Sequence, residues 1–264
     1  GGKKSIPAVR KLLDDSNEFI QGRAIWLLAK LGPEGLKIVE SQLTNQNPQI
    51  RVCAFRAIRH ENHRLIEHAV KLAGDPSPIV RREVALSMRY IPFGKAKDIL
   101  LQIAKGYDGE DRYYVEAFGI GCTDKEEKMY AELKKRHRSK KYDPVYSGLV
   151  WRLHPVSSVP ELKSWALDAK LDTKINRSML FALSLIDAPQ AAEAMVEIAK
   201  HEKNEISSLA RSFIDKRDQG IWNKFKVKDI LAGKSTGETI YADRLAPTFF
   251  GSESKLPSTS KILS

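Results

Sequence analysis

The sequence predicts an all-α fold, an α-solenoid of about seven helix pairs that form a right-handed superhelix. The first observation is a repeat. Ile50-Arg51 is followed by Ala54, and the same order of an apolar, a polar and a small or β-branched residue begins at Ile20 and at Val80, 30 residues away on either side. A fixed period of this length is typical of repeat proteins, in which each unit packs against its neighbours.

Composition is the second observation. Of 264 residues, 42% are hydrophobic and 29% are charged, whereas Gly and Pro number only 16 and 12. This balance provides enough apolar residues for a continuous core and argues against general disorder. The abundant Leu, Ala, Lys and Glu favour helices, so composition and period predict the same fold class.

The repeat also predicts which residues pack one unit against the next. Its spacing places the apolar and the small residue on adjacent turns of one helix face. We therefore expect this face to be buried between successive repeats. The repeat-packing residues predicted in this way are Ile20, Ala24, Ile50, Ala54, Val80, Val84, Ile175 and Ile206.

Capping residues mark the helices of the N-terminal half. Pro7 falls in the first turn of a short helix, where its missing N–H costs little. Asn17 or Ser16 is expected to cap the next helix, Asn47 a later one and Asp75 the one that begins beside it. The helices predicted here span residues 5–13, 18–31, 33–43, 47–59, 62–74, 75–88 and 94–106.

Beyond residue 106 the period loosens but the alternation continues. Two helix pairs are expected, at 111–120 with 124–136 and at 145–153 with 159–169. Ile175 and Ile206, 31 residues apart, then recover the earlier spacing. The first helices of the pairs, here called first-type helices, are predicted to begin near residues 18, 47, 77, 110, 144, 173 and 204.

The two ends predict neighbours outside the chain. The helix at 5–13 has no partner before it, which suggests that an earlier segment is missing. We expect a solenoid over residues 1–231 and a Ser/Pro-rich linker over 232–264 that leads to an absent C-terminal domain. The aromatic residues Tyr241, Phe249 and Phe250 predict that part of this linker packs on the last helices.

Charge leaves several partner classes open. The net charge is +11, and residues 51–100 carry ten Lys and Arg against five Asp and Glu. A basic stripe could attract an acidic protein, lipid head groups or nucleic acid. The favoured interpretation is that these residues are solvated helix ends, with some arginines bonding neighbouring repeats. No apolar run approaches the roughly 18 residues of a membrane span, so no transmembrane segment is predicted.

No pattern of catalysis is present in the sequence. There is no nucleophile elbow, Walker loop or G-x-G-x-x-G motif, so we expect a protein that is not an enzyme. Cys53, one of two cysteines, lies between apolar residues and is predicted to pack rather than react. His60, His63 and His68, with Glu61 and Glu67, invite a metal site, but their spacing matches no zinc pattern. An exposed loop between helices is the favoured explanation, and no metal site is predicted.

The candidate interaction surface combines arginines, two tyrosines and a basic run. In the run KKRHRSKK at 134–141, a solvated loop is favoured over phosphate binding. The two adjacent tyrosines of one helix cannot both face inward, so one is expected at the surface. The candidate residues are Arg51, Arg81, Arg82, Tyr113, Tyr114, Lys134, Lys135, Arg136 and Arg138. Of these, Arg51 and Arg81 are expected to link one repeat to the next.

The copies NPQIRVCAFRAI and DPSPIVRREVALSMRYI resemble HEAT-like repeats of the phycobilisome-lyase type, over most of residues 14–217. Three stretches, GRAIWLLAKLG, YDGEDRYYVEAFGIG and TFFGSESKLPSTSKIL, resemble the HEAT-repeat region of bacterial PVC-type haem-binding proteins, also called membrane-bound dehydrogenases. That resemblance implies a propeller-like dehydrogenase domain before this region and a cytochrome c domain after it. The haem motif C-x-x-C-H is missing here, so no haem ligand is assigned to any residue.

We therefore expect a non-catalytic scaffold or interaction module of a multidomain bacterial redox protein. It would bind protein domains, within the same polypeptide or on a partner, and would position a dehydrogenase-like domain and a c-type haem domain for electron transfer. No cofactor is expected in this chain. Haem c in the missing domain and a periplasmic or cell-envelope location are implied by the resemblance alone.

Two other functions remain open. The chain could bind nucleic acid through a basic concave face, as HEAT-like DNA glycosylases do, an interpretation that depends on charge and fold alone. A lyase-like or chromophore-handling role follows from the repeat resemblance and is ranked last, because a repeat is not a site.

Overall fold

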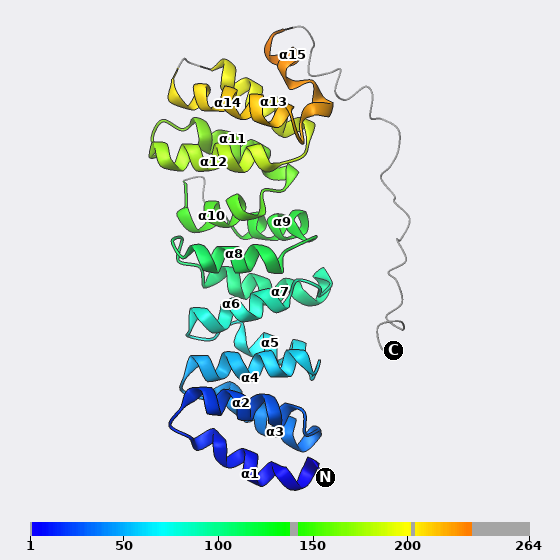
Figure 1. Ribbon diagram of the computed structural model, residues 1–264. Helices are drawn as coiled ribbons and strands as arrows, with labels where there is room; N and C mark the ends of the chain where they lie inside the picture. The colour runs from blue at the N-terminus through cyan, green and yellow to red at the C-terminus, as the bar shows by residue number, and fades with distance from the viewer. Residues whose placement is uncertain (1, 138–141, 202–203, 234–264) are drawn as a thin grey trace. The chain divides into compact units, whose positions relative to one another are not determined.

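The computed structural model describes residues 2–137, 142–201 and 204–233 (Figure 1). Helices are the only regular secondary structure in these three ranges, so the predicted all-α fold class is confirmed. The α-helices are α1 (Ile6–Lys11), α2 (Glu18–Ala29), α3 (Pro33–Ser41), α4 (Pro48–His60), α5 (Leu65–Leu72), α6 (Pro78–Ser87), α7 (Phe93–Lys105), α8 (Arg112–Gly121), α9 (Glu126–Arg136), α10 (Pro144–Leu153), α11 (Val159–Leu167), α12 (Thr173–Leu185), α13 (Pro189–Lys200), α14 (Glu205–Asp218) and α15 (Val227–Leu231). Short 3-10 helices are η1 (Gly2–Ser5), η2 (Leu12–Asp14), η3 (Gln42–Thr44), η4 (Val156–Ser158) and η5 (Asn223–Phe225).

The chain divides into two compact units, Gly1–Trp165 and Ala166–Ser264. The boundary falls inside the range 1–231 that the sequence assigned to one solenoid. Most of the predicted linker, residues 234–264, lies outside the described residues, and so do the three aromatic residues expected to pack there.

In the first unit, helices pack in two rows that follow chain order (Figure 1). One row consists of α2, α4, α6, α8 and α10, each of which contacts the next. In the other row, α5 contacts α7 and α7 contacts α9. The first row contains the first-type helices, and their predicted starts lie within two residues of those observed.

The second unit is held together around α13. This helix packs against α12, α14 and α15. Trp222, between α14 and α15, is fully buried, and its indole Nε1 donates a hydrogen bond to the carbonyl oxygen of Ile186 at 2.9 Å. A large apolar ring with its polar atom satisfied therefore fixes the end of this unit.

The residues predicted to pack the repeats divide into two groups. Ala24, Ile50, Ala54, Val80 and Val84 are at most 3% exposed. Ile20, Ile175 and Ile206 are only half-buried. In α12 and α14 the next residue along the chain, Asn176 or Ser207, is buried instead, so the inward face there is rotated toward a polar position.

The predicted helix caps Asn17 and Asn47 form, and Asp111 caps a third helix. The side-chain oxygens of Asn17, Asn47 and Asp111 accept hydrogen bonds from backbone N–H groups in the first turns of α2, α4 and α8. The prediction for Asp75 was wrong, because α6 begins three residues later, at Pro78. The carboxylate of Asp75 accepts from the N–H of Ser77, ahead of the helix, and is otherwise engaged by an arginine.

Helix α5 is shorter than the predicted range 62–74. Its start is delayed to Leu65 because Asn62 and Arg64 adopt left-handed backbone conformations, with φ of 50° and 45°. Such conformations interrupt a right-handed helix. The chain between α4 and α5 consequently makes a sharp turn at His63.

Helices α2 and α3 approach each other closely at Gly35. A Cβ at this position would collide with the backbone carbonyl of Leu28 in α2. Backbone atoms cannot move aside as a flexible side chain can, so only glycine fits here. Gly94, also in the first turn of a helix of the second row, has no atom within 4 Å of where a Cβ would lie.

Gly35→Ala and Gly94→Ala are therefore expected to change stability in opposite directions. Gly35→Ala should lower the free energy of unfolding by about 1–3 kcal/mol through overpacking. Gly94→Ala should leave it unchanged or raise it by up to about 1 kcal/mol, as helix propensity predicts. Urea unfolding followed by circular dichroism measures both variants, and equal shifts would contradict the close approach.

Candidate functional site

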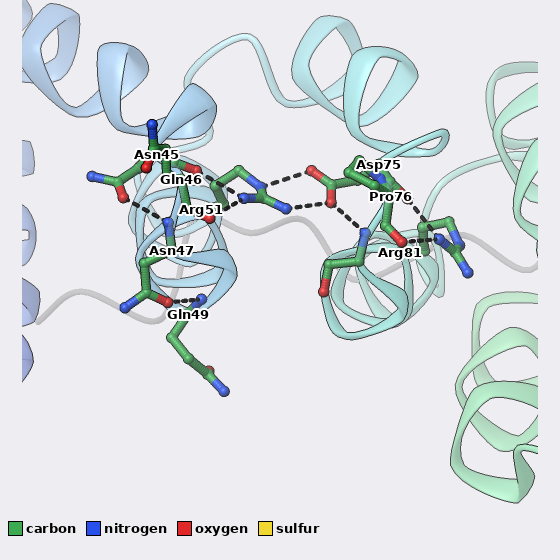
Figure 2. A network of polar contacts seen from close by, with 9 residues as sticks. Asn45, Gln46, Asn47, Gln49, Arg51, Asp75, Pro76 and Arg81 are labelled. Carbon is green, nitrogen blue, oxygen red and sulfur yellow. Dashed lines mark hydrogen bonds and ion pairs between the residues drawn. The ribbon is translucent and has the colours of Figure 1, made fainter.

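The arginine at the centre of the sequence repeat is a buried structural residue. Arg51 is 8% exposed, and its guanidinium makes two bonds to the carboxylate of Asp75, from Nε at 2.8 Å and from Nη2 at 2.6 Å (Figure 2). Its Nη1 also donates to the carbonyl oxygens of Asn45 and Gln46, at 2.8 and 3.1 Å. This bidentate pair joins α4 to the segment that precedes α6.

Arg81 repeats the arrangement 30 residues later. Its Nη1 donates to the carbonyl oxygens of Asp75 and Pro76, at 2.6 and 3.0 Å (Figure 2). Its Nη2 donates to the carbonyl oxygen of Gly106 at 3.1 Å, and its Nε to the hydroxyl of Tyr114 at 2.9 Å. Asp75 is therefore held by one arginine through its side chain and by the other through its backbone. We call these contacts the Arg51–Asp75–Arg81 network.

A shorter version of the contact occurs at the same helix position elsewhere. Arg51 and Arg81 are the fourth residues of α4 and α6, and Gln21 and Asn176 are the fourth residues of α2 and α12. The amide of Gln21 donates to the carbonyl oxygen of Asp15 at 2.5 Å, and that of Asn176 to the carbonyl oxygen of Asp168 at 3.0 Å. The fourth residue thus ties each of these helices to the loop before it.

Three of the predicted surface residues are consequently corrected. Arg51 and Tyr114 are buried, and Arg81 is half-buried with its guanidinium committed to four partners. Tyr114 is 2% exposed because its ring packs inward and its hydroxyl donates to the carbonyl oxygen of Ile103 at 2.8 Å. Its neighbour Tyr113 is 77% exposed, as expected of one residue of this pair.

In the described part of the basic run, Lys134, Lys135 and Arg136 are exposed and paired. Lys134, Lys135 and Arg136 lie in the last turn of α9. Lys134 forms an ion pair with Glu161 at 3.3 Å, and the other two bind Glu132 at 3.0 and 2.6 Å. Arg138 lies outside the described residues. The solvated interpretation of this run is consistent with these contacts.

A groove opens on the exposed face of α4, α6 and α8. It has a volume of about 680 Å³. The second and the ninth residue of each of the three helices line it, because residues seven positions apart lie on the same face of a helix. We call this surface the groove; its lining residues are Gln49, Val52, Arg56, Ile79, Arg82, Glu83, Leu86, Tyr113, Glu116, Ala117 and Ile120.

Glu83 is the buried charge at the floor of the groove. Its side chain is 4% exposed. Arg56 binds it through Nε at 2.9 Å and Nη2 at 2.7 Å, and Arg59 binds its other oxygen at 2.9 Å. Two arginines of α4 therefore neutralise one carboxylate of α6, and the hydrogen bond from Arg56 to Glu83 raises the pKa of Arg56.

Two further acidic residues pair with the remaining arginines around the groove. Arg82 lies 3.8 Å from the carboxylate of Asp111. Glu116 accepts from Arg152 at 2.7 Å and lies 3.6 Å from Arg112. Five arginines thus meet three carboxylates, which leaves a surplus of two positive charges among these side chains.

Exposed apolar residues continue the groove pattern onto α2. Phe19 and Trp26 are the second and ninth residues of α2, and they are 75% and 37% exposed. α2 packs directly against α4, whose corresponding residues Gln49 and Arg56 line the groove. Aromatic side chains at protein surfaces are enriched in binding sites, where they bury area at a small entropic cost.

Neither cysteine is activated. Cys122 is fully buried, and burial raises its pKa. Burial also raises the pKa of Cys53, whose Sγ lies 3.7 Å from the carbonyl oxygen of Gly22. Both thiols are therefore protonated near neutral pH, which does not favour nucleophilic chemistry.

No family model matches the chain, and neither does any curated protein. Among solved structures, two matches are each described as an engineered protein. One is 15% identical, with a TM-score of 0.37, and the match covers 81% of this chain and 97% of that one. The other has the same identity and TM-score, and its match covers 92% of this chain and 74% of that one. Neither likeness assigns the chain to a family.

In the part of the chain that the structure describes, no helix has the length and apolar character needed to cross a membrane. This agrees with the absence of a long apolar run in the sequence.

Sequence reasoning singled out only Arg82 and Tyr113 among the lining residues of the groove. The other lining residues were missed because the prediction was based on the most regular repeat positions, and those positions are buried. A usable signal was present: Trp26, Arg56 and Leu86 are spaced by 30 residues, as are Phe19, Gln49 and Ile79. Mapping the second and ninth helix positions would have located the groove.

Breaking the buried ion pair of the network is expected to be costly. Asp75→Asn leaves the guanidinium of Arg51 buried without a counter-charge and should lower the free energy of unfolding by about 3 kcal/mol or more. The control Arg112→Gln removes an exposed pair and should change it by less than about 1 kcal/mol. Urea unfolding measures both, and a loss for Asp75→Asn no larger than that of the control would refute the assignment.

Proposed function

We propose that this chain is a non-catalytic scaffold, an α-solenoid of HEAT-like repeats, whose groove binds a segment of another protein domain. The observation that carries the proposal is the composition of the groove. Apolar side chains of α4, α6 and α8 line it together with arginines that are already held in ion pairs. Such a surface is concave and can bury apolar area without stripping isolated charges of water.

The charge of the groove favours protein over nucleic acid. Phosphate binding depends on cations that are free to replace counterions, whereas the arginines here already have carboxylate partners. Glu83 and Glu116 line the groove as well, and each of them already binds two arginines. Two observations still favour the nucleic-acid alternative: the exposed ring of Tyr113 and the surplus of two positive charges.

The geometry suggests which protein segment fits. The groove runs across three helices, and its half-buried apolar residues, here called the apolar strip, are Ile79 and Leu86 of α6 and Ile120 of α8. A segment with an apolar face fills this strip, and acidic residues at its rim match the small positive surplus. We propose an amphipathic helix with acidic flanks, which is a common partner of apolar grooves.

The wider context of the scaffold rests on the sequence resemblance alone. By that resemblance, the partners are a dehydrogenase-like domain and a c-type haem domain of one bacterial redox protein located in the cell envelope. A C-x-x-C-H motif in the coding sequence shortly after Ser264 would support the haem part of the proposal. The absence of this motif would contradict the haem part of the proposal. The proposal that the groove binds a protein segment does not depend on it.

A peptide selection tests the binding proposal. A displayed library of random peptides is selected on the immobilised chain, and fluorescence anisotropy measures the affinity of the enriched peptides. We expect peptides that alternate apolar and acidic residues. Tyr113→Ala and Arg82→Gln should each weaken binding by about tenfold, which is about 1.4 kcal/mol. Tyr90→Ala is the matched control, because Tyr90 is 86% exposed but does not line the groove.

Two outcomes would overturn the proposal. The first is that the selected peptides bind both groove variants as tightly as the unchanged chain. The second concerns duplex DNA of about 20 base pairs: retardation at physiological salt that is lost in Arg82→Gln would establish the nucleic-acid alternative. We expect no retardation under these conditions.

A further inference from the structure

A carboxylate and two imidazoles converge at the end of α3. The Nε2 atom of His68 lies 2.8 Å from Oε1 of Glu40, and the Nε2 atom of His63 lies 3.1 Å from the same oxygen. The ligand-type atoms of all three side chains lie within 4.8 Å of one another. The rings of His63 and His68 are stacked, with centroids 6.4 Å apart and planes inclined by 29°.

Local backbone geometry brings these residues together from three elements. Glu40 is in the last turn of α3, and His68 is in α5. His63 reaches the same carboxylate oxygen from the turn between α4 and α5, where Asn62 and Arg64 on either side of it have left-handed backbone conformations. The N–H of His63 also donates to the carbonyl oxygen of Ile58 at 3.0 Å, which fixes the turn.

The third histidine of the sequence cluster faces elsewhere. The ring of His60 packs edge-on against Trp26, with centroids 5.6 Å apart, and its Nδ1 contacts Glu61 and Lys30 at 2.9 and 3.4 Å. The sequence grouped His60 with His63 and His68 and did not include Glu40, which is 23 residues before His63. The spatial cluster therefore differs from the sequence cluster.

We propose that Glu40, His63 and His68 bind a divalent transition-metal ion of the zinc type. Two imidazole nitrogens and one carboxylate oxygen match the ligand preferences of Zn²⁺ and Co²⁺ rather than those of Ca²⁺ or Mg²⁺. Three protein ligands leave a fourth position for water, as in zinc sites that are not fully closed.

The distances are compatible with such coordination. Bond lengths of about 2.0–2.1 Å in a tetrahedral zinc site place neighbouring ligand atoms about 3.3 Å apart. The two contacts to Glu40, at 2.8 and 3.1 Å, are slightly shorter than this, and the ligand atoms of the two imidazoles lie within 4.8 Å of each other, so side-chain rotations would bring the three atoms to the tetrahedral spacing. His68 is 4% exposed and Glu40 is half-buried, which holds two of the three ligands in place.

One cation already competes for the site. Nη1 of Arg64 lies 3.2 Å from Oε1 of Glu40, while its Nη2 binds Glu67 at 2.6 Å. The side chain of Arg64 is half-exposed, so it can withdraw toward Glu67 when an ion enters. Removing the guanidinium of Arg64 should therefore strengthen metal binding. If the cluster only stabilised the fold, the same change would not increase the affinity for metal.

Titration of the purified chain with Co²⁺ and Zn²⁺ tests the site. Visible absorption follows Co²⁺, and isothermal calorimetry follows Zn²⁺. We expect one ion per chain, binding weakened by more than about tenfold in His68→Asn, His63→Asn and Glu40→Gln, and tighter binding in Arg64→Gln. His60→Asn is the matched control, since it removes a nearby histidine that faces Trp26, and it should bind like the unchanged chain.

The proposal fails if the unchanged chain binds no ion, or if His60→Asn weakens binding as much as His63→Asn does. It also fails if Arg64→Gln weakens binding. Circular dichroism identifies variants that do not fold, and the half-exposed His63 provides the ligand variant that is expected to fold normally. The test is independent of the groove, because none of the variants changes a residue that lines it.

Discussion

The first unit depends on one buried charge interaction, the bidentate contact between Arg51 and Asp75. An arginine side chain inside a protein loses its hydration, and only a well-oriented carboxylate with further acceptors can replace it. Asp75 provides the carboxylate, and the carbonyl groups of Asn45 and Gln46 provide the acceptors. This contact ties α4 to the segment that precedes α6. Apolar packing of Ile50, Ala54, Val80 and Val84 then fills the space that remains.

The groove follows from the same spacing. Because α4, α6 and α8 are held side by side with similar offsets, residues at equivalent positions line up across the three helices. The inner positions carry small and apolar residues, and the outer positions carry arginine, glutamate and tyrosine together with Ile79, Leu86 and Ile120. The two sides of each first-type helix thus differ in role. The inward side packs against neighbouring helices, and the outward side presents side chains to solvent.

The sequence predicted much of the fold because its signals were local. Asparagine before a helix, proline in its first turn and the 30-residue period placed the starts of α2 and α4 within one residue. The errors arose where a residue acts over a distance. Asp75 looked like a helix cap, but its carboxylate is used by an arginine 24 residues away. The delayed start of α5 depends on the left-handed backbone conformations of Asn62 and Arg64. Neither residue is glycine, the residue that usually indicates such a conformation in a sequence. Glu40 could not be linked to the histidines, because the contact requires knowledge of how α3 meets α5.

The double role of Asp75 limits how this protein can evolve by duplication. A repeat unit that exchanges freely must present the same partner to each neighbour, yet Asp75 uses its carboxylate toward the preceding unit and its backbone toward Arg81. The corresponding loops begin with Asn45, which offers a carbonyl group without a charge, and with Gly106, which has no side chain. A copy of α4 inserted after α6 would bring an arginine without a matching acid. Neighbouring repeats therefore offer different acceptors to these arginines, and they are not interchangeable at this contact.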